Sequence, residues 1–301
     1  MAADDEGDRS KRTARLVPYG LLSPGMLWLI LFFLVPLVTL ARTSLSVKTS
    51  RFDPNDISFT WELSNYTSSI SDFSEQFIRS FLYAGAATLL CVAIGYPVAY
   101  VIAFRGGRFK NVLLGLVVVP FFTSFLIRTL AWATVLADNG PVLSILDGAG
   151  FVRPLEALGI VSDGRLLSTH AAVIGGLTYN FLPFMILPIY VSLEKIDLGL
   201  TEAAKDLYNN GWAAFRKVVL PLSLPGVFAG SLLTFIPAAG DFINAQFLGG
   251  PKNTMIGTVV QNRFLTQGDL PTAAALSFIL MIIITVGTLV YARLLGTDEL
   301  V

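Results

Sequence analysis

The chain has 301 residues, of which 54% are hydrophobic and only 14% charged, with a mean hydropathy of +0.67 and a net charge of zero. These values exclude a water-soluble domain of ordinary composition, and the charge balance gives no reason to expect a nucleic-acid partner. The one cysteine, Cys91, lies in an apolar run, which excludes an intramolecular disulfide and most thiolate metal sites.

The N-terminal segment combines a polar tail with a long apolar run. Residues 1–18 form the tail, in which four acids precede four cations. The apolar run from Tyr19 to Ala41 has 23 residues. This exceeds the length of a signal-peptide core, roughly 7–15 residues, and is enough to cross a hydrocarbon layer of about 30 Å. We therefore predict a retained transmembrane helix, followed by an outer loop to residue 76, rather than a cleaved signal peptide.

Five further apolar runs are expected to cross the membrane, which makes the chain an all-α membrane protein with six transmembrane helices. The fourth run is predicted to be broken by Pro183 and Pro188, and the fifth contains Pro237, Gly240 and Asp241. The long loop 138–169 is expected to carry a short interfacial helix packed on the outer face. The five runs are 77–104, 112–137, 171–193, 224–245 and 272–295.

The distribution of Lys and Arg predicts the orientation of these spans. Segments that we assign to the inner side hold 12 of the 21 cations, and the assigned outer loops hold six. Because cytoplasmic loops carry an excess of Lys and Arg, this two-to-one bias places both termini in the cytoplasm, including the short tail 296–301.

The longest polar interruption between late spans runs from Glu194 to Pro225. Asp197 is suited to cap a short helix whose apolar stripe is Leu200, Ala203, Ala204 and Leu207, and Asn209-Asn210-Gly211 then ends that helix. Glu202 and Asp206 lie one turn apart, a like-charge pair that costs a few tenths of a kcal/mol, roughly, in isolation. Such a surface suits a partner that supplies cations; an ordinary solvated cytoplasmic loop is the alternative.

These same residues carry a resemblance to a known family. Glu202-Ala203-Ala204, followed by Leu220-Pro221, resembles the EAA loop of type I ABC importer permeases, whose short helices dock into a cleft on a cytoplasmic ATPase. The family usually has Gly where this chain has Tyr208. If a glycine with positive φ is needed for the turn, the Asn-Asn-Gly run ending at Gly211 is expected to supply it. The resemblance assigns ATPase coupling to Glu202, Ala203, Ala204, Asp206, Gly211, Leu220 and Pro221 within loop 194–223.

Further stretches are similar to the first of the two permeases in spermidine/putrescine importers, although related permeases for other solutes share parts of them. They lie at 120–129, 182–195, 249–257 and 271–277. The resemblance implies a MetI-like domain over residues 77–295 with a five-helix core, in a multi-pass bacterial cell membrane protein. It also implies a heterodimer with a second homologous permease, two cytoplasmic ATP-binding subunits and an extracytoplasmic solute-binding protein. ATP would then be used by the partner, and this chain would bind no cofactor.

Polar residues inside the spans are candidates for a substrate pathway, because they are costly in hydrocarbon and usually face a cavity or a partner. Asp241 can bind a cationic substrate, or meet water near the outer end of its helix, or pair with an arginine. Arg128 invites the pathway interpretation too, but extension to the interface or an ion pair with a neighbouring helix is the structural alternative. Tyr179, Asn180 and Asn244 can bind a ligand or bond between helices.

Catalysis finds no support in the sequence. There is no Walker A loop, HExxH or GxSxG motif, and no paired His–carboxylate cluster. We therefore expect a permease rather than an enzyme. A secondary transporter working without an ATPase is the main rival, and it would need inverted repeats with broken helices in both halves, which the sequence does not display.

Overall fold

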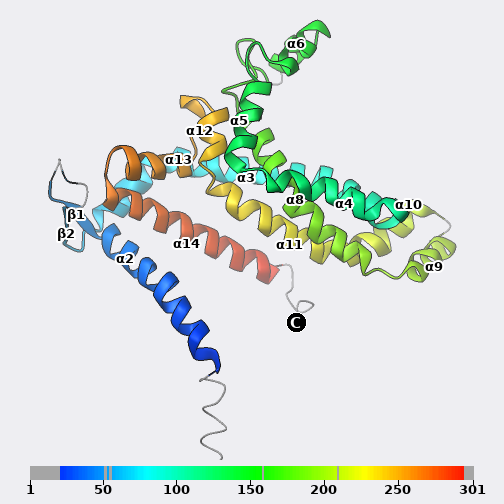
Figure 1. The fold of residues 1–301 in the computed structure, drawn as a ribbon, viewed down its shortest axis with the longest axis horizontal. Helices are drawn as coiled ribbons and strands as arrows, with labels where there is room; N and C mark the ends of the chain where they lie inside the picture. The colour runs from blue at the N-terminus through cyan, green and yellow to red at the C-terminus, as the bar shows by residue number, and fades with distance from the viewer. Residues whose placement is uncertain (1–20, 51–52, 54–55, 158, 209, 295–301) are drawn as a thin grey trace, which may run out of the picture.

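A computed structural model describes residues 21–50, 53, 56–157, 159–208 and 210–294, omitting the side chains of residues 198, 205 and 294. The tails at 1–18 and 296–301, and the predicted start of the first span at Tyr19, lie outside these residues. The described part is an elongated bundle in which α3, α8, α11 and α14 run along the long axis (Figure 1).

Five helices are long and apolar enough to cross a membrane, or six if one bent pair counts as a span. They agree with the predicted positions, with two shifts of boundary. The second begins at Ser64 rather than Phe77, and the fifth is continuous from Gly211. The single helices are Leu21–Ser44, α3 (Ser64–Arg105), α8 (His170–Glu194), Gly211–Ala239 and Leu270–Arg293.

The third predicted span is bent rather than straight. α4 (Lys110–Val118) continues into the short helix η3 (Val119–Phe122), and α5 (Phe125–Val135) then leaves at 94°. Thr123 and Ser124 both adopt extended backbone, with ψ of 142° and 135°. Pro120 lacks an N–H and Ser124 is a residue that starts helices, so the sequence supplies local reasons for the break.

Proline behaves differently in the fourth and fifth spans than predicted. α8 continues as one helix through Pro183 and Pro188, so the prediction that these residues break it is wrong. α11 (Leu220–Ala239) also passes Pro225 and Pro237 and ends at Gly240. Neighbouring helices can satisfy the backbone groups that a proline frees in a membrane bundle. Asp241 consequently lies between α11 and α12 (Ile243–Leu248), not inside a helix.

The segments between the spans hold short elements. β1 (Ser46–Lys48) pairs antiparallel with β2 (Ile57–Phe59), with Val47 opposite Ser58. Loop 138–169 contains two helices instead of one, and they stand beyond α5 (Figure 1). The remaining elements are η1 (Ile30–Leu34), α2 (Val35–Ser44), η2 (Gly107–Phe109), α6 (Pro141–Gly148), α7 (Val152–Ala157), α9 (Leu198–Tyr208), α10 (Gly211–Ala214), η4 (Phe215–Val219), η5 (Pro251–Asn253), α13 (Ile256–Gln261), η6 (Asn262–Thr266) and α14 (Leu270–Leu294).

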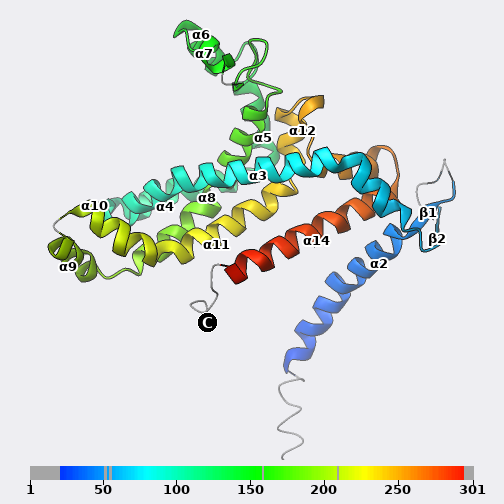
Figure 2. The same ribbon diagram turned by 180° about the vertical axis from the view of Figure 1, so that it is seen from behind.

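Small residues bring α11 close against α8. A Cβ atom at Gly226 would lie 2.6 Å from the Pro188 carbonyl oxygen, and one at Gly230 would lie 2.8 Å from Met185 Sδ. These two glycines are four residues apart, the small-xxx-small spacing that lets transmembrane helices approach closely. Figure 2 shows α3, α8 and α11 side by side as a result.

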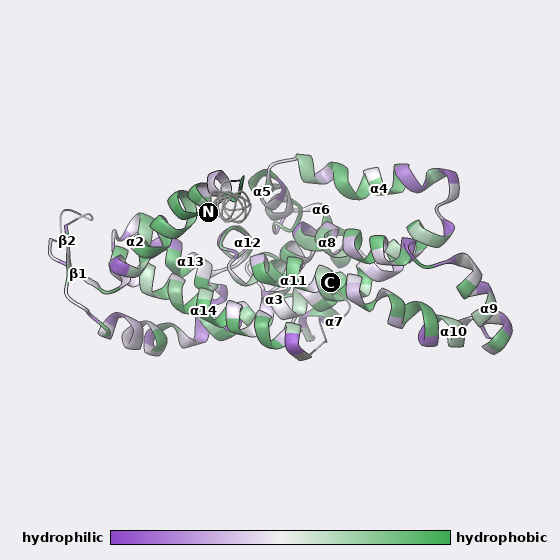
Figure 3. Ribbon diagram, turned by 90° about the horizontal axis from the view of Figure 1, so that it is seen from below, coloured by the Kyte–Doolittle hydropathy of each residue, from purple (hydrophilic) through white to green (hydrophobic). Residues whose placement is uncertain are grey.

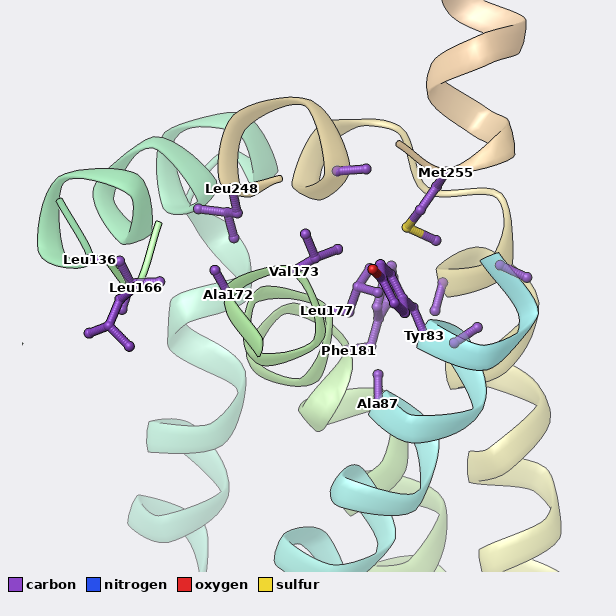
Figure 4. Packing of buried hydrophobic residues seen from close by; sticks show 14 of the residues in the cluster. Tyr83, Ala87, Leu136, Leu166, Ala172, Val173, Leu177, Phe181, Leu248 and Met255 are labelled. Atoms are coloured by element: carbon purple, nitrogen blue, oxygen red, sulfur yellow. The ribbon is translucent and has the colours of Figure 1, made fainter. Parts of the chain in front are cut away.

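The largest buried core joins these helices to the loops at the end of the bundle opposite α9. Val173, Leu177 and Phe181 of α8 point toward Tyr83 of α3 and Met255 (Figure 4). By contrast, large apolar side chains elsewhere lie on the surface, among them Trp28 and Phe33 at 64% and 66% exposure. Hydrophobic residues predominate along α2 and α14 in Figure 3, as expected of helices that face lipid.

Candidate functional site: a coupling loop and a buried polar cluster

α9 is a short helix at one end of the long axis, between α8 and α11 (Figure 1). Asp197 precedes its first residue, and the Asp197 Oδ1 accepts a 2.8 Å hydrogen bond from the Gly199 N–H. This is the capping that the sequence predicted. The helix therefore starts where a local hydrogen bond satisfies one of its free N–H groups.

Only one residue of the predicted apolar stripe is buried against the rest of the protein. Ala204 is buried, whereas Ala203 is exposed, and Leu200 and Leu207 have exposed fractions of 54% and 75%. Glu202 and Asp206 are exposed as well. α9 thus presents leucines together with acidic groups at the tip of the molecule, an arrangement typical of surfaces that bind another protein.

The turn after α9 differs from the one predicted from the family pattern. Gly211 does not adopt a positive φ; it is the first residue of α10. Asn210 is extended, with φ −154° and ψ 120°, and its Oδ1 accepts a 2.9 Å bond from the Trp212 N–H. Asn209 lies outside the described residues. Asn210 therefore acts as a helix cap, and neither of the two described residues of the Asn-Asn-Gly run adopts the left-handed conformation considered for that run.

Contacts at the end of the bundle that carries α9 fix this loop to α3 and α4. The Phe215 ring lies edge-on to the rings of Tyr96 and Tyr100, each 5.8 Å away. The Tyr96 hydroxyl hydrogen-bonds the Ser223 Oγ at 2.7 Å, and Lys110 forms a 2.6 Å ion pair with Glu194. Leu220 and Pro221 begin α11, in the same turns as Ser223. The segment from Glu194 to Ser223 is thus held against α3 and α4 at both of its ends.

Lys217 links the two halves of the loop. Its Nζ lies 4.5 Å from the ring centroid of Tyr208, the residue at the position where the family usually has glycine. Such a cation–π contact contributes about 0.5–1 kcal/mol at an exposed site. The Tyr208 side chain thus gives the turn after α9 a contact that glycine would not provide.

A cluster of neutral polar side chains lies where α5, α8 and α12 meet. The Asn180 Nδ2 donates to the Asn244 Oδ1 at 3.0 Å and to the Thr129 Oγ1 at 3.2 Å, and all three residues have an exposed fraction of 0%. Of the two roles predicted for Asn180 and Asn244, the structure shows interhelical hydrogen bonding. The Asn180 Oδ1 and the Asn244 Nδ2 remain buried without a partner in the structure. Thr129 was missed in the sequence, although its position beside Arg128 inside a span was a signal.

Asp241 extends this cluster by capping α12. Its Oδ1 accepts a 2.7 Å hydrogen bond from the Asn244 N–H, and its exposed fraction is 8%. No ion pair to Asp241 occurs among the residues that the structure describes. The neighbouring backbone is tightly packed, because a Cβ at Gly257 would lie 2.4 Å from the Gly240 carbonyl oxygen. Asp241 thus stabilises the backbone conformation of the break between α11 and α12.

Arg128 neither reaches the surface nor pairs with an acid, so both structural roles predicted for it are wrong. Its exposed fraction is 7%, and no described acidic residue lies in ion-pair distance of its guanidinium. The Arg128 Cζ instead lies 4.9 Å from the ring centroid of Phe121 and 5.7 Å from that of Phe125. The bend after η3 places these rings around it, which the prediction of a straight third span did not foresee.

Tyr179 stands apart from these groups. It is 37% exposed, and its ring lies edge-on to Trp132 at 5.4 Å. Because Tyr179 and Asn180 are adjacent on one helix, they point in different directions, and the structure does not bring Tyr179 into the polar cluster. The part of the chain that the structure describes holds no group of three or more metal-ligating side chains.

Comparison with known proteins places this geometry in a family. Residues 66–295 match the family "Binding-protein-dependent transport system inner membrane component". The chain is 38% identical to the spermidine/putrescine transport system permease protein PotB of Haemophilus influenzae, over 88% of this chain and 90% of that protein. It is 36% identical to PotB of Escherichia coli, over 88% and 93%.

Solved structures agree on the fold. A bacterial ABC transporter involved in the import of the acidic polysaccharide alginate matches with a TM-score of 0.66 at 17% identity, covering 94% of this chain and 96% of that one. The alginate transporter in complex with its pentasaccharide-bound periplasmic protein matches with a TM-score of 0.63 at 18% identity, covering 94% and 95%. The relatives are permease subunits rather than enzymes, and the chain belongs to the inner membrane components of binding-protein-dependent transport systems, as a multi-pass permease of an ABC importer.

Proposed function

We propose that this permease imports a polyamine, spermidine or putrescine, with a second homologous permease, two ATP-binding subunits and an extracytoplasmic solute-binding protein. The observation that carries the substrate class is identity of 36–38% to spermidine/putrescine permeases over 88% of this chain. That match spans the broken third span, the polar cluster and α9, rather than the coupling loop alone.

The exposed surface of α9 is the proposed contact with the ATPase. Leu200 and Leu207 supply apolar area, and Glu202 and Asp206 supply negative charge to a cleft lined by cations. ATP would be bound and hydrolysed by the partner alone. The contacts of Phe215, Tyr96 and Ser223 then carry closure of the ATPase dimer into α8 and α11.

The orientation follows from the cations around α9. Arg105 ends α3, Lys110 begins α4, Lys195 follows α8, and Arg216 and Lys217 lie in η4, so the cations flank the segment that carries α9. This excess of positive charge supports a cytoplasmic position for that end and for both termini. The opposite end, with the β1–β2 pair and α13, then faces the solute-binding protein. Membrane lipid covers the exposed apolar sides of α2 and α14.

The pathway is proposed to pass beside the buried cluster of Asn180 and Asn244. Transported ammonium groups need acceptor oxygens, and the unpartnered Asn180 Oδ1 is one. Asp241 contributes a negative charge nearby while capping α12. Tyr179 and Arg128 complete the set of pathway candidates.

The test is uptake of radiolabelled spermidine into cells that lack their own polyamine importers and express the complete system. We expect ATP-dependent uptake that excess unlabelled putrescine reduces and excess amino acid or sugar does not. Absence of spermidine uptake by an assembled complex, or uptake of another solute alone, would refute the substrate assignment and leave the family assignment intact.

A further inference from the structure

Arg128 lies in a cavity of about 500 Å³ at the bend of the third span. η3, α5, α8 and α11 meet there, and the lining includes Phe121, Phe125, Phe184, Asn180 and Pro237. Phe121 and Phe184 pack edge to face at 4.8 Å, and Phe125 lies 6.0 Å from Phe181. The cavity is thus walled by aromatic rings and contains one positive charge.

The structure gives this charge no anionic partner. Among the described residues no carboxylate pairs with Arg128, and its Nε is buried without a hydrogen bond. A buried cation without a counter-ion is unfavourable, so the faces of Phe121 and Phe125 are the main groups that stabilise the guanidinium there. The same ring faces also attract an ammonium group or another ligand cation, because the ring quadrupole attracts positive charge.

A second unpartnered atom belongs to Asn180, one of the residues that line the cavity, and it is an acceptor of the kind that an ammonium group needs. The Asn180 Oδ1 is fully buried and accepts no hydrogen bond, while a guanidinium or an ammonium can donate one. Aromatic rings with one acceptor oxygen are a recognised environment for alkylammonium groups. Two cations in one cavity of about 500 Å³ with mostly apolar walls repel each other, so the site favours either the Arg128 guanidinium or a transported ammonium group over both together.

We propose that Arg128 is a resident cation that closes the pathway, and that an ammonium group of the substrate takes its place against Phe121, Phe125 and Asn180 during transport. This inference rests on the proposed function, because it requires a cationic substrate. Arg128 acts here as a gating and specificity-determining residue. Its positive charge excludes cations while it occupies the cavity, and its lack of a carboxylate partner allows it to leave.

The experiment measures the KM of spermidine uptake by the complete importer carrying Arg128→Met, Arg128→Gln or Arg128→Lys. Removing the resident charge should lower KM several-fold in the Met and Gln variants, whereas Arg128→Lys should retain a KM close to that of the unmodified chain. In the Arg128→Met background, Phe121→Leu should raise KM by about 2- to 30-fold, the range that a cation–π contact supports. Phe33→Leu, on a lipid-exposed ring, is the matched control and should leave KM unchanged.

The outcomes separate this inference from the proposed function. No spermidine uptake by the unmodified importer refutes both. Normal uptake with KM unchanged or raised in Arg128→Met and Arg128→Gln refutes the gating role alone. An equal effect of Phe121→Leu and Phe33→Leu on KM also refutes the gating role. Loss of both neutral variants from the membrane would show that Arg128 holds the fold together, which also overturns the inference.

Discussion

Replacement of Gly226 by alanine tests whether close packing of α11 on α8 holds the bundle together. The added Cβ would lie 2.6 Å from the Pro188 carbonyl oxygen and 2.5 Å from the Ser192 Oγ. The hydroxyl can rotate, but the carbonyl belongs to a helix backbone and cannot move without shifting α8. Overpacking of this kind costs about 1–3 kcal/mol, and a clash with backbone falls at the upper end. Alanine gains back about 0.5–1 kcal/mol of helix propensity. We therefore expect the variant to be destabilised by about 2 kcal/mol.

The assay is thermal unfolding of the detergent-purified chain, followed by tryptophan fluorescence. Gly175→Ala, on α8, is the matched control, since a Cβ there meets nothing within 4 Å. The control should be neutral or stabilised by up to about 1 kcal/mol. Equal stability of Gly226→Ala and Gly175→Ala would refute the assigned packing of these helices.

Further substitutions at three positions probe the polar cluster, the Asp241 cap of α12 and the turn after α9. Asn180→Leu removes the donor to Asn244 and Thr129 and should destabilise the purified chain by about 1–2 kcal/mol. The control Thr134→Val removes a hydroxyl that bonds only its own helix and should not destabilise the chain. Equal unfolding temperatures of the two variants would contradict the cluster. Asp241→Ala should lower the free energy of unfolding by about 1 kcal/mol. Asp241→Asn should lower it much less, because the amide oxygen can still accept the hydrogen bond from the Asn244 N–H. Equal losses of stability in chemical denaturation would argue against capping. Tyr208→Leu removes the contact with Lys217 and should raise tryptic cleavage after Lys205 and Arg216, the basic residues that flank the turn, by a few-fold, roughly, in limited digestion. An unchanged cleavage rate would contradict that contact.

The sequence predicted the spans well because membrane insertion depends on length and hydropathy, which are properties of the chain alone. α8 at His170–Glu194 and α14 at Leu270–Leu294 lie within a few residues of the predicted runs. Asp197 was also recognised as a cap, because its hydrogen bond to Gly199 is local.

Features that depend on tertiary packing were predicted less well. Pro183 and Pro188 have the composition of helix breaks, but the surrounding bundle keeps α8 continuous. The structural roles predicted for Arg128 were extension to the interface or an ion pair with a neighbouring helix. Phenylalanine rings surround it instead, because the third span bends by 94° at two extended residues, and hydropathy does not reveal such a bend. Asn180 and Asn244 are 64 positions apart, so two roles were possible from the sequence, and only the 3.0 Å contact between the two side chains distinguishes them.

The central claim is that this permease couples to an ATPase through α9. The most direct measurement is affinity purification of the tagged chain in mild detergent, with its partners identified by mass spectrometry. We predict recovery of a second permease and an ATPase, loss of the ATPase alone with Glu202→Lys, and retention of both with Glu156→Lys, an exposed acid on α7. Recovery of the folded chain without an ATPase, or retention of the ATPase by Glu202→Lys together with normal uptake, would contradict the coupling role of α9.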